Sequence, residues 1–152
     1  NIPGFQNCYL INSAPQVGIR ETRRIIGEYT ITRQDVIESR DFPDSIARSS
    51  YYIDIHHNDD TTEATWQEPG RSFAIPYRSL VPVKLDGLLV AGRCISASHD
   101  GGHASCRVQV VCMATGQAAG TAAALSVMDK TAPRCLRISK LQAVLKDQDV
   151  II

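Results

Sequence analysis

The chain has 152 residues, of which 43% are hydrophobic, and its 16 basic residues balance its 16 acidic residues. This length and composition predict a folded globular protein with a core of its own. The formal net charge of zero argues against a general electrostatic nucleic-acid binder, so we expect no nucleic-acid partner. The five cysteines are widely spaced and include no CxxC pair, which predicts reduced thiols and no disulfide framework.

The chain starts at Asn1 with neither an initiator methionine nor a signal peptide. We therefore expect a fragment of a longer protein, and the missing N-terminal part of that protein is one expected partner. The compartment stays open on this basis. It is predicted to be cytoplasmic only if the parent protein has no signal peptide.

The N-terminal part of the chain predicts short elements. Residues 7–12 (NCYLIN) suit a short strand, whereas residues 19–31 suit a helix by their Glu and Arg content and a strand by their later β-branched residues. Thr32 stands three residues before Asp35, which is the spacing of a capping box, although Asp is weaker there than Glu. This pair predicts a short helix that runs to about Ser39.

The middle of the chain predicts strands separated by a loop. Side chains of residues 51–56 divide into one apolar and one polar face, which predicts a strand with one wet face. Residues 57–72 are polar and predict a loop. Within residues 73–83, Pro76 and Pro82 predict that any strand is short or lies at a sheet edge.

The C-terminal part predicts one buried strand and two helices. Residues 87–91 (GLLVA) are all apolar and predict the strand. Residues 109–128 predict a long helix of mostly small residues, too polar for a membrane span, so we expect it to pack inside the protein and expect no membrane partner. Ser139 is the predicted cap of a final amphipathic helix. Its apolar face holds Leu141, Val144 and Leu145.

A polar loop separates the predicted strand from the long helix, and α/β proteins place ligands at such loops. Gly92 permits close approach of a ligand, and Arg93 suits phosphate or carboxylate; a tight turn with a solvated arginine is the alternative. The first N–H groups of the helix from Gln109 suit an electron-rich edge of a ligand. The alternative is that the small residues of this helix serve only tight packing in the core. Arg107 adds a positive charge next to the positive end of the helix, which is unfavourable for stability and therefore favours an anionic ligand there. The alternative is that a nearby acid such as Asp100 pairs with Arg107.

The same loop carries His99 and His103, and an imidazole at such a place can exchange a proton near neutral pH. A zinc site with Cys94 and Cys106 is the alternative, but the spacing does not support it and we predict no metal site. His56 lies at the end of the alternating strand, where a solvated strand end is the alternative to a role in proton transfer.

Tyr77 and Arg78 lie between two prolines in the segment FAIPYRSLVP. An arginine held there suits a substrate carboxylate, and a structural ion pair is the alternative. The basic run over residues 20–24 predicts a solvated face or pairing with acids elsewhere.

Several segments, in this order, resemble the C-terminal half of FAD-dependent oxidoreductases with a glutathione-reductase-like fold. They are VGIRETRRIIGEYTIT, YYIDIH, FAIPYRSLVP, LLVAGRCISASH and CMATGQAAGTAAAL. The resemblance covers about residues 16–146, and RETRR and GQAAG are its most specific parts. It implies the α/β class, here as an α+β fragment, with part of a substrate domain in residues 1–84 and the final strand and helix of the FAD-binding domain in residues 85–152.

The resemblance also implies roles for single residues. The flavin-binding set is Gly92, Arg93, Arg107, Gln109, Val110 and Val111, the last three through their backbone N–H groups. The candidate catalytic set on the substrate side is His56, Tyr77, Arg78, His99 and His103. In the full-length protein we expect hydride transfer between an unknown small organic substrate and the flavin, with a histidine moving the proton and Arg78 or Arg107 holding an anionic group.

The family's G-x-G-x-x-G motif, which binds the cofactor pyrophosphate, does not occur in this chain. The isolated chain is therefore expected to bind FAD weakly or not at all and to be inactive. It is also expected to self-associate, because its apolar strand and helix would lack their usual cover. Two alternatives stay open at this point, a non-catalytic binding or assembly module and a zinc-dependent hydrolase that uses His99, His103 and a cysteine.

Overall fold

A computed structural model describes residues 2–56, 61–65 and 70–152. Its helices are α1 (Arg33–Ile37), α2 (Gly102–Cys106), α3 (Gln109–Met128) and α4 (Ile138–Asp147), and its strands are β1 (Ser45–Ser49), β2 (Ile53–His56), β3 (Thr62–Thr65) and β4 (Phe73–Pro76). Short 3-10 turns cover Tyr77–Ser79, Gly92–Cys94 and Pro133–Cys135. This mixture of helices and small antiparallel sheets confirms the predicted class.

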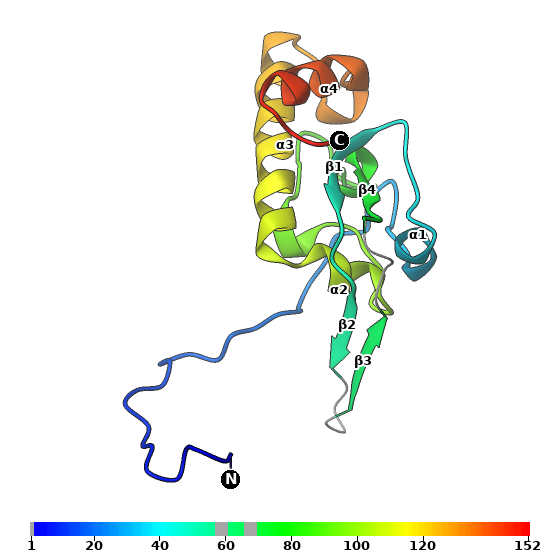
Figure 1. Cartoon of the computed structure of the whole chain (residues 1–152). Helices are drawn as coiled ribbons and strands as arrows, with labels where there is room; N and C mark the ends of the chain where they lie inside the picture. The colour runs from blue at the N-terminus through cyan, green and yellow to red at the C-terminus, as the bar shows by residue number, and fades with distance from the viewer. Residues whose placement is uncertain (1, 57–60, 66–69) are drawn as a thin grey trace.

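Helix α3 is the longest element and stands beside β1 and β4, with α4 near one end and α2 near the other (Figure 1). Strands β1 and β4 pair antiparallel, with Ser49 opposite Phe73 and an irregularity between Ser45 and Ala47. Strands β2 and β3 form a second antiparallel pair, which points away from α4 (Figure 1). The predicted strand over 51–56 is thus confirmed as β2, which starts at Ile53, and the proline-limited strand as β4. Strand β1 was not predicted, and β3 lies within residues 57–72, so the prediction of a loop over that whole stretch is wrong.

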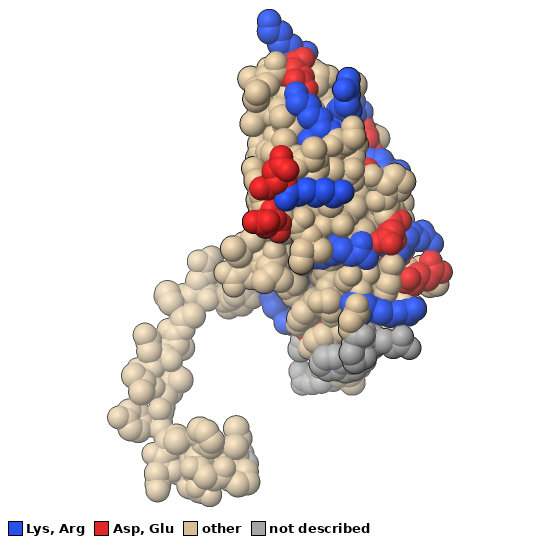
Figure 2. Space-filling model, turned by 45° about the horizontal axis from the view of Figure 1, so that its top comes forward, with Lys and Arg blue, Asp and Glu red and all other residues tan. Residues whose placement is uncertain are grey.

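Residues 2–26 form neither helix nor strand. The predicted strand over residues 7–12 is wrong, because Tyr9, Leu10 and Ile11 extend into solvent, between 81% and 89% exposed. Figure 2 shows this segment leaving the body of the protein as a surface without charged side chains. Without a neighbouring edge to pair with, its apolar residues have nothing to fold against in the described part of the chain.

The capping box at the start of α1 is confirmed. The Asp35 N–H donates to Thr32 Oγ1 (3.2 Å), and the Thr32 N–H donates to Asp35 Oδ2 (2.8 Å). The helix ends two residues before the predicted end, and Ser39 then takes a left-handed conformation with φ of 54°. Asp35 is fully buried and also accepts a hydrogen bond from the Tyr29 hydroxyl, so the cap ties α1 to the chain before it.

The predicted strand over residues 87–91 is wrong. Val90 donates one backbone hydrogen bond to the Leu80 carbonyl (2.9 Å), and Leu88 is 43% exposed. A strand needs a neighbouring edge along its length, and no strand of the described chain lies beside this segment. Its apolar composition is therefore not matched by burial here.

Helix α3 begins and ends as predicted, and it packs into the core through one face. That core joins residues from both sides of the predicted boundary at residue 84; its members include Ile46, Phe73, Ile75, Ala118, Ala122, Leu125, Leu141 and Leu145. The division into two domain parts stays a prediction.

The apolar face of α4 is confirmed, since Leu141 and Leu145 are fully buried. The predicted cap, Ser139, is wrong, because Arg137 holds the cap position and makes no side-chain hydrogen bond there.

The opposite face of α3 is open. Val110, Met113 and Val127 are between 66% and 79% exposed along it. By length and composition alone, α3 is also apolar enough to cross a membrane, a property that core helices share. Its packing against β1 and α4 accounts for one face only, so the expectation of no membrane partner stays a prediction.

Gly102 is held where α2 meets the chain before α1. A Cβ atom at this position would lie 2.2 Å from the Ile31 carbonyl oxygen, whereas a Cβ at Gly116 on the open face of α3 would meet nothing within 4 Å. We expect Gly102→Ala to lower the free energy of unfolding by about 1–3 kcal/mol through overpacking. Gly116→Ala is the control and is expected to raise it by about 1 kcal/mol through helix propensity.

Urea unfolding followed by circular dichroism measures both changes. Equal unfolding midpoints for the Gly102→Ala variant and the unaltered chain would contradict the close approach of α2 to Ile31.

Candidate functional site

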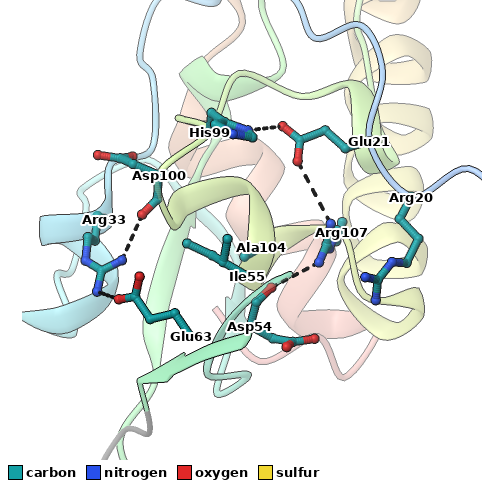
Figure 3. A pocket seen from close by; sticks show the side chains of 10 residues that line it. All are labelled: Arg20, Glu21, Arg33, Asp54, Ile55, Glu63, His99, Asp100, Ala104 and Arg107. Carbon is teal, nitrogen blue, oxygen red and sulfur yellow. Dashed lines mark hydrogen bonds and ion pairs between the residues drawn. The ribbon is translucent and has the colours of Figure 1, made fainter. Parts of the chain in front are cut away.

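The Glu21 carboxylate lies at the centre of a charged cluster beside α2. His99 Nδ1 donates to Glu21 Oε1 (2.7 Å), and Arg24 pairs with the same oxygen. His103 Nδ1 lies 3.4 Å from Glu21 Oε2, and the Arg107 guanidinium lies 3.9 Å from that oxygen. We call these five residues the Glu21 cluster; Figure 3 shows the carboxylate between His99 and Arg107.

The backbone holds Glu21 in reach of the cluster. The Ile25 N–H donates to the Cys94 carbonyl (3.0 Å), and the Ile31 N–H donates to the Ser96 carbonyl (3.1 Å). These bonds lay residues 25–31 along the segment that precedes His99. Two stretches far apart in the sequence are thereby fixed side by side, and the chain ahead of Ile25 is brought over α2.

His103 is almost fully buried in α2, with 1% of its surface exposed. Its Nε2 lies 3.0 Å from the Arg93 carbonyl oxygen, and because a carbonyl only accepts, Nε2 carries a hydrogen. The second nitrogen, Nδ1, therefore gains a proton when the ring becomes charged, and it faces Glu21. Burial lowers the pKa of His103, and the negative charge of Glu21 opposes part of that shift.

Glu21 is held in its charged form. Burial disfavours the carboxylate, but hydrogen bonds from His99 and Arg24 and the charge of His103 outweigh it, so the pKa of Glu21 lies below its ordinary value. An ionised Glu21 next to two imidazoles can therefore accept a hydrogen bond from His99 and stabilise a proton on the ring nitrogens that face it. His99 reaches solvent, with 76% of its side chain exposed.

Arg107 joins α2 to β2. It caps the C-terminal end of α2, and its Nη2 donates to the Asp54 carbonyl (3.0 Å). The proposed alternative partner, Asp100, is wrong: the acid that faces Arg107 is Glu21, and the Asp100 carbonyl accepts from Arg33 instead. The side chain of Arg107 is mostly covered, with 13% exposed.

Two adjoining cavities open next to the cluster. The larger has a volume of about 450 Å³ and is lined by Arg20, Glu21, Arg33, Asp54, Ile55, Glu63, His99, Asp100, Ala104 and Arg107 (Figure 3). The smaller, of about 250 Å³, is lined by Arg20, Tyr51, Asp54, Arg93, Arg107 and Val108. Arg20, Asp54 and Arg107 line both, so the two cavities meet there. The site is thus polar and open to solvent, and it lies at the start of α3.

The comparisons with known proteins assign this architecture to a family. The family model described as FAD dependent oxidoreductase matches residues 1–145. The chain belongs to the FAD-dependent oxidoreductase family. No curated protein and no solved structure matches the chain. The resemblance seen in the RETRR and GQAAG segments is thereby confirmed.

Of the residues that the family resemblance assigns to flavin, Arg93 and Arg107 line the smaller cavity, and the others lie in the Gly92 turn and the first turn of α3. Gly92 has a φ of 72°, and its N–H donates to Thr115 Oγ1 (3.0 Å), which fixes the turn against α3. Arg93 is exposed. No side chain caps the start of α3, where Val108 holds the cap position, so the N–H groups of its first turn face outward without a side-chain acceptor. Of the residues in that turn, Gln109 and Val110 are exposed, whereas the Val111 side chain is buried.

These residues fit the flavin end of an FAD molecule, because the uncapped start of α3 offers backbone N–H groups to an electron-rich ring edge, whereas the Gly92 N–H is already bound to Thr115. They offer nothing for the adenosine diphosphate end. The motif that would bind the pyrophosphate does not occur in the sequence.

Tyr77 and Arg78 line neither of the two cavities. The Tyr77 ring is buried and its hydroxyl donates to the Pro133 carbonyl (3.0 Å), and burial raises the pKa of Tyr77. Arg78 makes a bidentate pair with Asp44 (2.9 and 3.1 Å) and lies over the Tyr29 ring. The structural ion pair weighed for Arg78 is therefore present. His56 is the last residue of β2, and its side chain lies outside the described part of the structure.

Within residues 2–56, 61–65 and 70–152, no group of three His, Cys, Asp or Glu side chains is placed to hold a metal ion. Cys106 is fully buried, and burial raises the pKa of its thiol. The thiol is thus held protonated, the opposite of what a zinc ligand needs. Nothing in the described structure supports the zinc hydrolase alternative.

Sequence reasoning missed Glu21, which the basic run over residues 20–24 made look like a solvated face. It also missed the pair between Arg33 and Glu63, which closes one side of the larger cavity. One signal for Glu21 was present: a single acid among three arginines, in one of the segments most typical of the family.

The pairing of Glu21 with His103 predicts a measurable pKa change. Glu21→Gln removes the negative charge that raises the pKa of His103, so that pKa is expected to fall further below its ordinary value of 6.5. NMR titration of the His103 ring protons measures this. Because the unfolded chain then binds the proton more readily than the folded chain, the variant is also expected to lose more stability as the pH falls from 6.5 toward 4.5.

Glu38→Gln is the matched control, since Glu38 is an exposed acid at the end of α1. It is expected to leave the His103 titration unchanged. An unchanged His103 pKa in the Glu21→Gln variant would show that the two residues are not coupled.

Proposed function

We propose that this chain is the C-terminal part of an enzyme that transfers a hydride between a small organic substrate and flavin, and that the Glu21 cluster handles the accompanying proton. The observation that carries this proposal is the position of one carboxylate between two imidazoles beside an open cavity at the start of α3. FAD, when bound, supplies the hydride chemistry. The chain itself supplies orientation and proton transfer.

The two histidines support different steps of that proton transfer. His99 is exposed and donates to Glu21, so it can exchange a proton with substrate or solvent at Nε2. His103 is buried and anchored through Nε2 to the Arg93 carbonyl. Its Nδ1 faces Glu21, where a proton is stabilised by the carboxylate and opposed by burial. Glu21 thus acts on both rings, as a positioning residue.

The proposal requires a second part of the protein. The start of α3 and the Gly92 turn would hold only the flavin end of FAD, and the exposed face of α3 carries the apolar residues Val110 and Met113. A dinucleotide-binding βαβ unit of the parent protein would bind the rest of the cofactor and would cover the apolar face of α3. This chain alone is expected to purify without flavin colour and, with that apolar face uncovered, to self-associate.

Flavin reduction in the parent protein tests the proposal. We expect His99→Gln to slow the reduction of bound flavin by substrate by about a hundredfold, the usual contribution of a general acid or base. Glu21→Gln is expected to shift the pH profile of that step to lower pH, because His103 loses the negative partner that raises its pKa. Stopped-flow absorbance of the flavin measures both, and Glu38→Gln serves as the control.

Unchanged rates and pH profiles in the His99→Gln and Glu21→Gln variants would remove the cluster from the reaction. A parent protein that binds no flavin would instead favour the non-catalytic binding or assembly module, because the fold would then be kept without its cofactor.

A further inference from the structure

Residues 2–19 have the composition of a segment that packs against a surface. They include no charged side chain, whereas segments that stay disordered in water are typically polar and charged. Their large apolar side chains are between 53% and 89% exposed; these are Ile2, Phe5, Tyr9, Leu10, Ile11, Val17 and Ile19. Exposure of so much apolar surface is unfavourable in water, so a surface that covers this segment would stabilise it.

In an extended conformation, residues 9–19 have one apolar side. Alternate side chains of a strand point the same way. This side carries Tyr9, Ile11, Val17 and Ile19. The opposite side has Leu10 as its only large apolar residue, and Pro15, which has no N–H to donate, restricts such a strand to a sheet edge. The segment therefore suits the edge of a sheet next to an apolar surface.

A groove between β1 and α3 is such a surface. Two cavities form it, of about 420 and 210 Å³, and they meet at Arg48, which lines both. Its α3 side consists of Val110, Val111, Met113, Ala114 and Gln117. Its other side consists of residues 47–52, and residues 148–151 line one end of it. Val110 and Met113 are exposed, so the groove is open to a further chain.

The open edge of β1 offers backbone partners in this groove. Among the described strands, β1 pairs only with β4. Arg48 lies opposite Ala74, whose N–H donates away from β1 to the Arg40 carbonyl (2.9 Å). In an antiparallel pair, a residue in this position directs its own N–H and carbonyl to the other edge, so the backbone of Arg48 faces the groove. An unpaired edge of this kind accepts a further strand.

The segment over residues 2–19 leads away from the body of its own copy. No backbone hydrogen bond joins residues 9–19 to the rest of the described chain, and the segment runs away from α4 (Figure 1). The groove spans Val110 to Gln117 along α3, which is about 10 Å at the helical rise. An extended chain of residues 9–19 reaches about 30 Å, enough to fill the groove of a neighbouring copy and to span the gap to it.

We infer that residues 9–19 of one copy add a strand to the open edge of β1 in a second copy, with their apolar side against Val110 and Met113. The exchange is reciprocal, so two copies related by a twofold axis use both segments and both grooves. In such strand addition, backbone hydrogen bonds supply affinity and the side chains supply specificity. The inference goes beyond the proposed function, because it holds with or without flavin.

Sedimentation equilibrium of the 152-residue chain tests this interface, and we expect a dimer. Val110→Gln with Met113→Gln removes apolar contact from the groove, and Ile11→Gln with Val17→Gln removes it from the segment. Each pair of changes is expected to raise the Kd of the dimer by at least about tenfold, because it takes apolar side chains out of both contacts. All four side chains are exposed in the single copy, and circular dichroism checks that each variant keeps its fold.

Val127→Gln with Met128→Gln is the matched control. These side chains are similarly exposed on α3 but lie at its other end, outside the groove, so the dimer is expected to stay unchanged. An equal mixture of the groove variant and the segment variant is expected to form mixed dimers more tightly than either variant forms its own. In a mixed dimer both losses fall in one contact and the other contact stays intact.

A monomeric chain, or a dimer that the control weakens as much as the groove variant does, overturns the inference. A mixture without preference for mixed dimers overturns it as well, because association would then not join the segment of one copy to the groove of the other. None of these outcomes bears on flavin reduction in the parent protein.

Discussion

The contact on which the site depends is that of the Glu21 carboxylate with His99, His103 and Arg107, beside its sequence neighbour Arg24. Glu21 belongs to a stretch that has no helix or strand of its own, and it is fixed there by the backbone bonds of the residues just after it to the Cys94–Ser96 turn. Its partners come from the loop before α2, from α2 itself and from its C-terminal cap. The half-buried Glu21 carboxylate thus joins three pieces of chain, and it is the negative charge that faces the buried His103 Nδ1, which has no hydrogen-bond partner in the described structure.

Helix α3 connects this site to the rest of the fold. One face is made of residues buried against β1 and α4, and its first turn lies beside the charged cavities. The other face is apolar and exposed, as is the segment over residues 2–19, which carries no charged side chain. Exposed apolar surfaces of this kind are consistent with the contact to further protein that we propose. The site is therefore placed at the boundary of what this chain covers by itself.

The local elements could be predicted where the chain's own chemistry decides them. The capping box at Thr32, the span of α3 and the buried face of α4 follow from spacing and periodicity, which need no distant partner. The strand over residues 87–91 could not be predicted correctly, because apolar composition indicates a buried strand only where a neighbouring strand edge is present.

The site, too, could be predicted only in part. His99, His103 and Arg107 were identified from their residue types and position, but the acid that joins them lies 78 residues from His99 in sequence, and only the fold brings it there. Asp100 was predicted as the alternative partner of Arg107 because it is the nearest acid in the sequence, whereas the fold places Glu21 there.

A crystal structure of the flavin-loaded parent protein tests most directly whether the Glu21 cluster serves the flavin. The account predicts an isoalloxazine ring against the first turn of α3 and the Gly92 turn, with the Glu21 carboxylate, His99 and His103 on the side where substrate enters. A ring bound elsewhere, or one separated from Glu21 by packed protein, would contradict it.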